Sequence, residues 1–156
     1  MTNTVPNQTL PPDGDSSLRV ETRFGEFEAD RRNLIDFPAG LPGFEHCRHF
    51  VIMSSISMAP LQCLHAVDGA PASFLVIDPR IVLPSYRCVL SAPDRARLGA
   101  DENTTLLWLA MVTISEDGPS HVNLRAPIVI NPAGMVGYQM MPHDSLYPVR
   151  HPLNVE

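Results

Sequence analysis

The sequence predicts a single all-β domain, and three observations carry that prediction. Apolar residues occur in short runs, most of them followed within a few positions by proline, glycine, aspartate or serine, which is typical of strands bounded by turns. Sixteen prolines against nine glycines argue against long helices, because proline fixes its own φ and removes a hydrogen-bond donor. A hydrophobic fraction of 44% in 156 residues is enough for one real core.

The elements begin after a polar N-terminal segment. Residues 1–17 are rich in proline, glycine, asparagine and aspartate, and we expect them to form a flexible tail before a single domain over 18–156. Residues 19–28 are predicted to form two short strands that meet near Gly25. Further strands are expected at 49–53, 61–67, 74–78 and 86–90.

One short helix is predicted after these strands. Ser91 supplies an N-cap, Pro93 lies in the first turn, and Gly99 stands where a C′ glycine would end the helix, so we expect a helix over Ser91–Leu98. The run 104–114 is apolar at both alternating sets of positions, which favours a strand covered on both faces.

A core hairpin is predicted next. Two antiparallel strands are expected at 121–130 and 135–141, joined by Asn131–Gly134, whose glycine can adopt a positive φ. The stretch Val122–Met141 contains no acid, no histidine and no cysteine. Such a lack of reactive groups is what a core hairpin should show, so the function is expected elsewhere.

Charge restricts the class of partner. The formal net charge is −6, and all eleven basic residues are arginines, scattered along the chain. No stretch offers the basic stripe that phosphate backbones require, so direct nucleic-acid binding is disfavoured. An acidic surface would instead attract basic protein partners.

Compartment and membrane association follow from the cysteines and the apolar runs. Cys47, Cys63 and Cys88 are an odd number without CxxC spacing, which indicates reduced thiols in a cytosol. No apolar run reaches the ~18 residues of a membrane span, and the first residues do not resemble a signal peptide. We therefore expect a soluble protein that is not exported.

No grouping of residues indicates catalysis or a cofactor. His46, Cys47 and His49 form a cluster of metal-ligating types, but a second matched pair of ligands is missing from the spacing. The acid pairs at 101–102 and 116–117 fall in predicted turns, where solvated carboxylates are ordinary. We expect no enzyme activity and no cofactor, and a protein that works by binding.

Four segments, taken in order, make the chain recognisable. They are DFPAGLPGFE at 36–45, FLVIDP at 74–79, VNLRAPIVIN at 122–131 and YPVRHPL at 147–153. Together they resemble the FliW family of flagellar assembly factors, and residues 23–26 also fit it. The resemblance runs from about Val20 to Leu153. One segment departs from it: 61–65 reads LQCLH, where the family usually has an aromatic residue followed by Trp-Leu-Gln.

The resemblance implies a fold, a compartment and two partners. It implies a cytoplasmic bacterial protein with a compact, barrel-like β fold and no enzymatic activity. Such a protein binds newly made flagellin and, once flagellin is exported, binds the RNA-binding regulator CsrA. CsrA then releases flagellin mRNA, and translation resumes.

The candidate partner contacts are apolar residues of the Pro-Gly-rich segment 37–44 together with predicted exposed acids. They are Phe37, Leu41, Phe44, Glu45, Asp101, Glu102, Glu116 and Asp117. The first interpretation of the segment is an ordered loop whose phenylalanines close one end of the core, and the second is a direct partner contact.

Two other classes of function are weighed against protein binding. One is a small β-barrel that binds a small molecule in its mouth, for which a deep apolar pocket with convergent polar groups would be evidence. A filled interior would favour protein partners. An enzyme is the third possibility.

Overall fold

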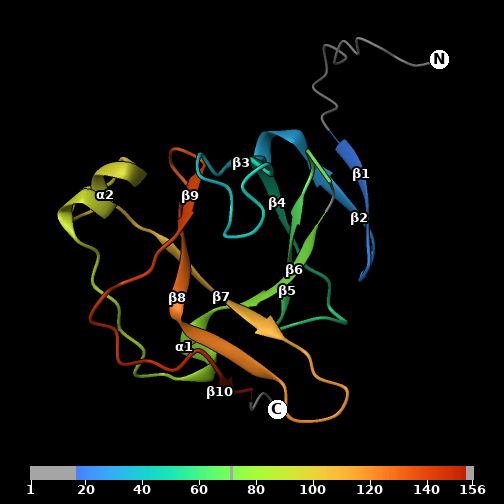
Figure 1. Cartoon of the computed structure of the whole chain (residues 1–156). Coiled ribbons are helices and arrows are strands. Elements are labelled where there is room, and N and C mark those ends of the chain that lie inside the picture. The colour runs from blue at the N-terminus through green and yellow to red at the C-terminus, as the bar shows by residue number, and fades with distance from the viewer. Residues whose placement is uncertain (1–16, 71, 154–156) are drawn as a thin grey trace.

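The computed structural model describes residues 17–70 and 72–153, which form a closed antiparallel β-barrel (Figure 1). Within that part of the chain the main sheet has the order β10-β8-β7-β6-β5-β4-β3-β9, and it closes because β9 also pairs with β8. The strands are β3 (Ile35–Asp36), β4 (His49–Met53), β5 (Gln62–Ala66), β6 (Ser73–Ile77), β7 (Leu107–Thr113), β8 (His121–Asn131), β9 (Val136–Gln139) and β10 (His151–Pro152). The predicted all-β, barrel-like fold is confirmed.

Pairing between neighbouring strands is antiparallel except at one junction. β3 and β9 run parallel, with Asp36 opposite Val136, and the Asp36 N–H donates to the Met135 carbonyl over 2.8 Å. This short contact closes the barrel. β10 lies outside the closed ring and pairs with the first residues of β8.

A hairpin packs against the outside of the barrel. β1 (Ser17–Thr22) and β2 (Gly25–Asp30) form a separate two-stranded sheet, and the 3₁₀ turn η1 (Arg31–Asn33) leads from β2 toward β3. Apolar residues of the hairpin form one cluster with the outer face of β4 and β5, including Val20, Val51, Met53 and Cys63.

The structure describes one residue of the predicted N-terminal tail. Ser17 belongs to β1 and pairs with Asp30, so its inclusion in the tail is wrong. The strand ladder explains the difference, because pairing with β2 extends β1 to a polar residue. The rest of the predicted tail, residues 1–16, lies outside the described residues, as do 154–156.

The predicted helix forms as its caps indicate. α2 (Ala92–Leu98) has Ser91 as its N-cap, whose hydroxyl accepts a hydrogen bond from the Asp94 N–H at 3.2 Å. Gly99 ends it in the left-handed conformation, with φ 66. Leu98 is buried against Val129 and Met140, so α2 covers the outer face of β8 and β9.

The segment between β6 and α2 differs from its prediction. α1 (Pro79–Val82), a single turn capped by Asp78, was not among the predicted elements. The predicted strand at 86–90 is wrong, because this segment has no ladder partner. The alternating apolar residues of this segment are buried by packing and not by strand pairing. Tyr86 and Leu90 are buried on the outside of the barrel, and the Tyr86 hydroxyl donates to the Leu124 carbonyl at 3.0 Å.

The predicted β8–β9 hairpin is confirmed, with one change at its turn. Asn131 pairs with Val136, but the positive φ belongs to Met135 (φ 51), and Gly134 has none. The Asn131 side chain organises the turn, because it accepts from the Ala133 N–H at 3.1 Å and donates to the Leu98 carbonyl at 2.8 Å. The expectation of two covered faces holds in the middle of β7, where Leu109 and Ala110 are buried.

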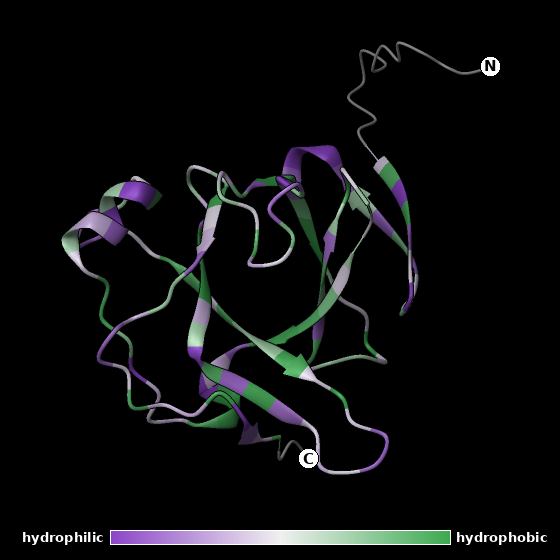
Figure 2. Ribbon diagram, in the orientation of Figure 1, coloured by the Kyte–Doolittle hydropathy of each residue, from purple (hydrophilic) through white to green (hydrophobic). Residues whose placement is uncertain are grey.

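Side chains fill the interior of the barrel. Figure 2 shows hydrophobic and hydrophilic positions alternating along the first half of β8, whereas from Ala126 to Asn131 every residue of this strand is buried. The buried interior cluster draws on every strand from β3 to β8 and on the β3–β4 loop, and consists of Ile35, Phe37, Leu41, Cys47, Phe50, Leu64, Ala66, Val76, Leu109, Ile128 and Ile130.

Candidate partner-binding surfaces

The Pro-Gly-rich segment 37–44 forms an ordered loop whose apolar residues turn inward. The Phe37 N–H donates to the Arg48 carbonyl and the Gly40 N–H to the Phe37 carbonyl, both at 2.8 Å. Gly40 has φ 64, and a Cβ there would lie 2.7 Å from the Phe44 carbonyl oxygen, so a larger residue would not fit. Phe37 is fully buried and Leu41 is 1% exposed. These two predicted contact residues belong to the core, as the first interpretation of the segment expects.

Phe44 is the predicted aromatic contact that reaches the surface. It is half-buried and packs edge-on against Phe74, with ring centroids 5.0 Å apart. Both rings line a small pocket of about 490 Å3 that also contains Arg23 and His65. The His65 Nδ1 lies 2.7 Å from the hydroxyl of Ser73.

The segment that departs from the family pattern lies beside this pocket. Cys63 is fully buried beneath the hairpin, and His65 is 5% exposed. Burial lowers the pKa of His65, so its ring is neutral near pH 7. Leu64, between them, points into the barrel. The changed residues 63 and 65 therefore alter the outer face of β5 and not its inner face.

Glu45 is exposed at the end of the loop, and its carboxylate forms a hydrogen bond within the loop. Its carboxylate accepts from the Gly43 N–H at 3.1 Å, and this hydrogen bond lowers its pKa.

Asp68 is a second acid near this loop, and it contacts the first residue of β4, His49. Burial opposes its ionisation, but the His49 ring at 2.7 Å and the N–H groups of His49 and Arg48 together lower its pKa. Both acids stay ionised near neutral pH.

The two predicted acid pairs are exposed but lie far apart. Asp101 and Glu102 precede β7, and Glu116 and Asp117 follow it, so the length of the strand, about 20 Å, separates the pairs. Hydrogen bonds from the Asn103 N–H and the Thr104 hydroxyl lower the pKa of Asp101. The candidate acids thus form separate surfaces and no single site.

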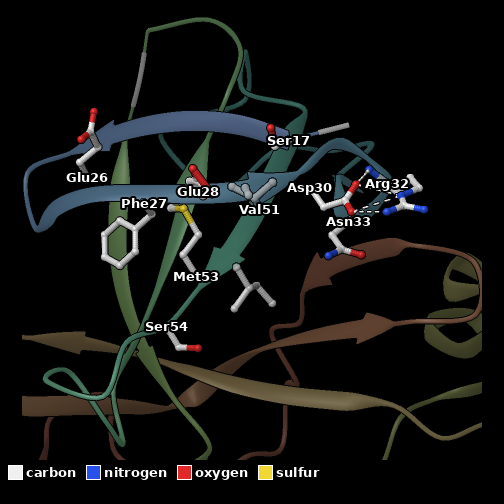
Figure 3. A pocket seen from close by; sticks show the side chains of 12 residues that line it. Ser17, Glu26, Phe27, Glu28, Asp30, Arg32, Asn33, Val51, Met53 and Ser54 are labelled. Atoms are coloured by element: carbon white, nitrogen blue, oxygen red, sulfur yellow. Dashed lines mark hydrogen bonds and ion pairs between the residues drawn. The ribbon is translucent and has the colours of Figure 1, made fainter. Parts of the chain in front are cut away.

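A groove that the sequence analysis missed lies between the hairpin and β4 (Figure 3). It has a volume of about 710 Å3 and is lined by residues 26–30 of β2, by η1, and by residues 51–54. Phe27 and Met53 point toward one another across it, and Asp30 is bonded to Arg32. The sequence signal was the alternation of acids with apolar residues in GEFEAD at 25–30.

A second missed surface carries exposed apolar side chains. Val89 is 82% exposed and Met141 is 60% exposed, and both line a groove of about 900 Å3 together with Asp94 and Asp144. The groove lies between the segment before α2 and the segment after β9. Leu146, 95% exposed, follows in that same C-terminal segment. Isolated apolar positions in a loop gave no pattern from which to predict it.

The cysteine and histidines that were considered as metal ligands have other contacts. Cys47 is buried and its thiol contacts the Ala70 carbonyl at 3.5 Å, while His49 pairs with Asp68. All three cysteines are free. Over residues 17–70 and 72–153, no group of three or more potential ligands could hold a metal ion. In that same part of the chain, no helix has the length and apolarity to span a membrane.

Comparison with known proteins gives consistent matches along nearly the whole chain. The family model described as "FliW protein" matches residues 19–153. The flagellar assembly factor FliW of Syntrophotalea carbinolica is 36% identical over 134 residues, covering 86% of this chain and 96% of that protein. That of Carboxydothermus hydrogenoformans is 35% identical over 131 residues, covering 83% and 84%. A crystal structure of the flagellar assembly factor FliW superimposes with a TM-score of 0.78 at 25% identity, covering 88% of this chain and 98% of that one.

The fold and its surfaces define a small closed β-barrel whose interior is filled and whose grooves lie on the outside. The family model and the relatives then identify it further. The chain belongs to the FliW family.

Proposed function

We propose that this chain is a cytoplasmic flagellar assembly factor that binds flagellin and antagonises CsrA, so that flagellin synthesis follows flagellin export. The observation that carries the proposal is the family match over residues 19–153, together with relatives named as flagellar assembly factors over most of their length. In this proposal the protein acts by binding and not by catalysis.

The filled interior supports a macromolecular partner. Small-molecule sites in barrels are concave and bury most of the ligand, whereas the interior here is occupied by Phe37, Phe50 and their neighbours, with the two rings 4.8 Å apart. The grooves are open and lie on the outer surface. This geometry favours the protein-partner interpretation over the barrel that binds a small molecule.

Charge supports a basic partner and argues against direct binding of RNA. The chain has a net charge of −6 and no lysine, and its exposed acids include Glu28, Glu45, Asp101 and Glu116. A surface of this kind attracts a small basic regulator such as CsrA and repels RNA. The groove at Val89 and Met141 exposes apolar side chains. We assign this groove to flagellin, because exposed apolar patches mark protein-binding sites and a contact of this kind does not depend on the charge of the partner.

The regulatory switch requires only that the two partners weaken each other. If bound flagellin lowers the affinity for CsrA by some factor, bound CsrA lowers the affinity for flagellin by the same factor. Overlapping sites and an allosteric change both satisfy this relation. Free chain would then reach CsrA only when flagellin has left.

Direct binding of purified proteins tests the proposal. The full-length chain is mixed with flagellin, with CsrA and with flagellin mRNA leader, each from the same bacterium, and each mixture is analysed by size-exclusion chromatography. We expect a complex with each protein and none with the RNA. If neither protein forms a complex across a range of salt concentrations, the proposed function is wrong, although family membership stands.

A further inference from the structure

Within residues 17–70 and 72–153, no strand lies beside the outer edge of β2. Thr22 and Gly25 close a two-residue turn and are therefore a hydrogen-bonded pair, and alternation then makes Phe27 a residue that bonds to β1. The N–H and C=O groups of Glu26 and Glu28 consequently point away from β1. Among the described residues, β2 pairs only with β1, and no backbone partner of these groups is found.

The facing part of β4 is unpaired in the same way. The Arg48 carbonyl accepts from the Phe37 N–H on the β3 side, so Phe50 and Ile52 also direct their backbone groups to that side. Ile35 opens β3 and lies opposite Phe50. Ile52 therefore has no strand residue opposite it within the described part of the chain.

These two edges flank the groove in Figure 3. At its base Val51 and Met53 are buried beneath the hairpin and Phe27 packs against them, whereas the exposed lining of the groove is mainly polar. A groove between open strand edges favours an extended chain as its ligand, since main-chain hydrogen bonds supply affinity and alternate side chains supply specificity. An open edge of this kind is also a liability unless something covers or protects it.

The side chains of β2 specify the chemistry of that ligand. Glu26 and Glu28 are exposed on the outward face, whereas Phe27 and Ala29 lie inward against the barrel. Neighbouring strands favour opposite charges on the same face. Within the hairpin Glu26 lies directly opposite Glu21, a like charge, and its carboxylate turns to the diagonal Arg19 at 3.6 Å. A strand added beside β2 should present basic residues outward and apolar residues inward.

The same charges argue against two other occupants. A second copy pairing β2 with β2 would bring Glu26 and Glu28 beside their own equivalents, which is unfavourable. The chain's own residues 1–16 contain two aspartates and no arginine or lysine. Neither offers the basic side chains that this edge favours.

We propose that the β2 edge, defined here as residues 25–30, is a docking site for an extended segment of a basic protein partner, which adds to the hairpin as a third strand. The inward side chains of that segment lie over the groove between β2 and β4, and its basic side chains lie beside Glu26 and Glu28. The inference deepens the proposed function by assigning a surface to its basic partner.

Proline substitution tests the backbone contact, because the outward N–H groups of β2 make no bond within the hairpin. Glu28→Pro removes one of them, and edge positions of this type tolerate proline. Glu21→Pro is the matched control: it changes the same residue type, in the same hairpin, on the opposite edge of β1. Glu28→Gln removes the charge and keeps the N–H. Circular dichroism melting confirms that each variant remains folded.

Binding is measured with full-length variants and purified CsrA as the basic probe, with flagellin in a parallel arm. We expect Glu28→Pro to weaken CsrA binding at least tenfold, Glu21→Pro to leave it unchanged, and Glu28→Gln to weaken it severalfold. Amide exchange of Glu26 and Glu28 should slow when CsrA binds. If the wild-type chain binds CsrA and Glu28→Pro binds equally well, the docking site is wrong while the proposed function stands.

Three further results would also overturn the docking site. One is loss of flagellin binding without loss of CsrA binding in Glu28→Pro, which would assign the edge to the other partner. The second is equal loss in Glu21→Pro, which would indicate a general effect on the hairpin. The third is slow exchange of the Glu26 and Glu28 amides in the protein alone. If that slow exchange depends on protein concentration, a second copy of the chain covers the edge. If it does not, the chain's own N-terminal segment covers the edge. Absence of wild-type binding to CsrA and to flagellin would instead remove the proposed function.

Discussion

The ring of Phe37 lies directly against the backbone of Gly137. A Cβ placed on Gly137 would stand 2.8 Å from Cζ of Phe37 and 3.0 Å from Cγ1 of Ile130. Gly137 is on β9, the strand that closes the barrel, and Phe37 is the first residue after β3. The Pro-Gly-rich loop therefore packs into the junction at which the barrel closes, and this explains why its apolar residues serve the core.

Gly137→Ala should lower the free energy of unfolding by about 1–3 kcal/mol, because the added methyl group overpacks a filled site. Urea denaturation measures the loss. Gly134→Ala is the control, since a Cβ there meets no atom closer than 3.8 Å. Equal stability of the two variants would show that the Phe37 ring moves aside freely.

The two phenylalanines of the loop should differ in their contribution to stability. Phe37→Ala removes a fully buried ring and should cost about 3–5 kcal/mol of unfolding free energy. Phe44→Ala removes a half-buried ring that contacts Phe74, so its cost should be less than half of that. Thermal melting compares them. If Phe44→Ala stays stable but no longer binds flagellin, the second interpretation of the loop holds at this residue.

Tyr86 should make stability fall at high pH. Burial, followed by the nearby Cys88 and Tyr147, raises the pKa of Tyr86 above its ordinary value of 10.0. Above pH 10 the unfolded chain loses this proton and the folded chain keeps it, so the stabilisation is complete below pH 10 and is lost as the pH rises further.

Tyr86→Phe tests this dependence. The variant lacks the hydrogen bond to the Leu124 carbonyl and should be about 1–3 kcal/mol less stable at pH 7, because a buried acceptor loses its partner. Its stability should then decline less steeply than that of the wild type above pH 10. Parallel curves from denaturation across pH 7–11 would contradict the assignment.

Salt should affect the association rates of the two partners differently. Raising the ionic strength from ~50 mM to ~500 mM shortens the screening length severalfold, so the association rate of CsrA should fall strongly. The flagellin rate should change little, because burial of apolar surface is not screened. Stopped-flow or interferometry measures both rates. A CsrA rate that does not depend on salt would remove the electrostatic attraction and leave family membership intact.

Local signals in the sequence predicted most elements well. The Ser91 cap and Gly99 fixed the ends of α2, and β4 begins and ends where its apolar run does. The segment 86–90 was wrongly predicted as a strand. An alternating run whose apolar side chains pack against a barrel has the same sequence pattern as a run that forms hydrogen bonds with a neighbouring strand. Long-range pairing was also invisible: the parallel contact between Asp36 and Val136 joins residues a hundred positions apart.

The candidate surfaces were harder to predict than the fold. Composition indicated exposed acids, and Glu45, Asp101 and Glu116 are exposed, but it could not show that they lie on separate surfaces. Phe37 and Leu41 were candidate partner contacts because they are apolar. Core residues are apolar as well, so the sequence could not distinguish the two roles. The open edge at Glu26 and Glu28 depends on which strand β2 pairs with, and that is a property of the folded chain only.

The most direct test of the central claim is reciprocal competition between the two partners. The dissociation constant of CsrA is measured by calorimetry with and without saturating flagellin, and that of flagellin with and without saturating CsrA. Both partners should bind, and each should weaken the binding of the other by the same factor, tenfold or more, because linked affinities are reciprocal. Binding of both partners at once with unchanged affinities would contradict it.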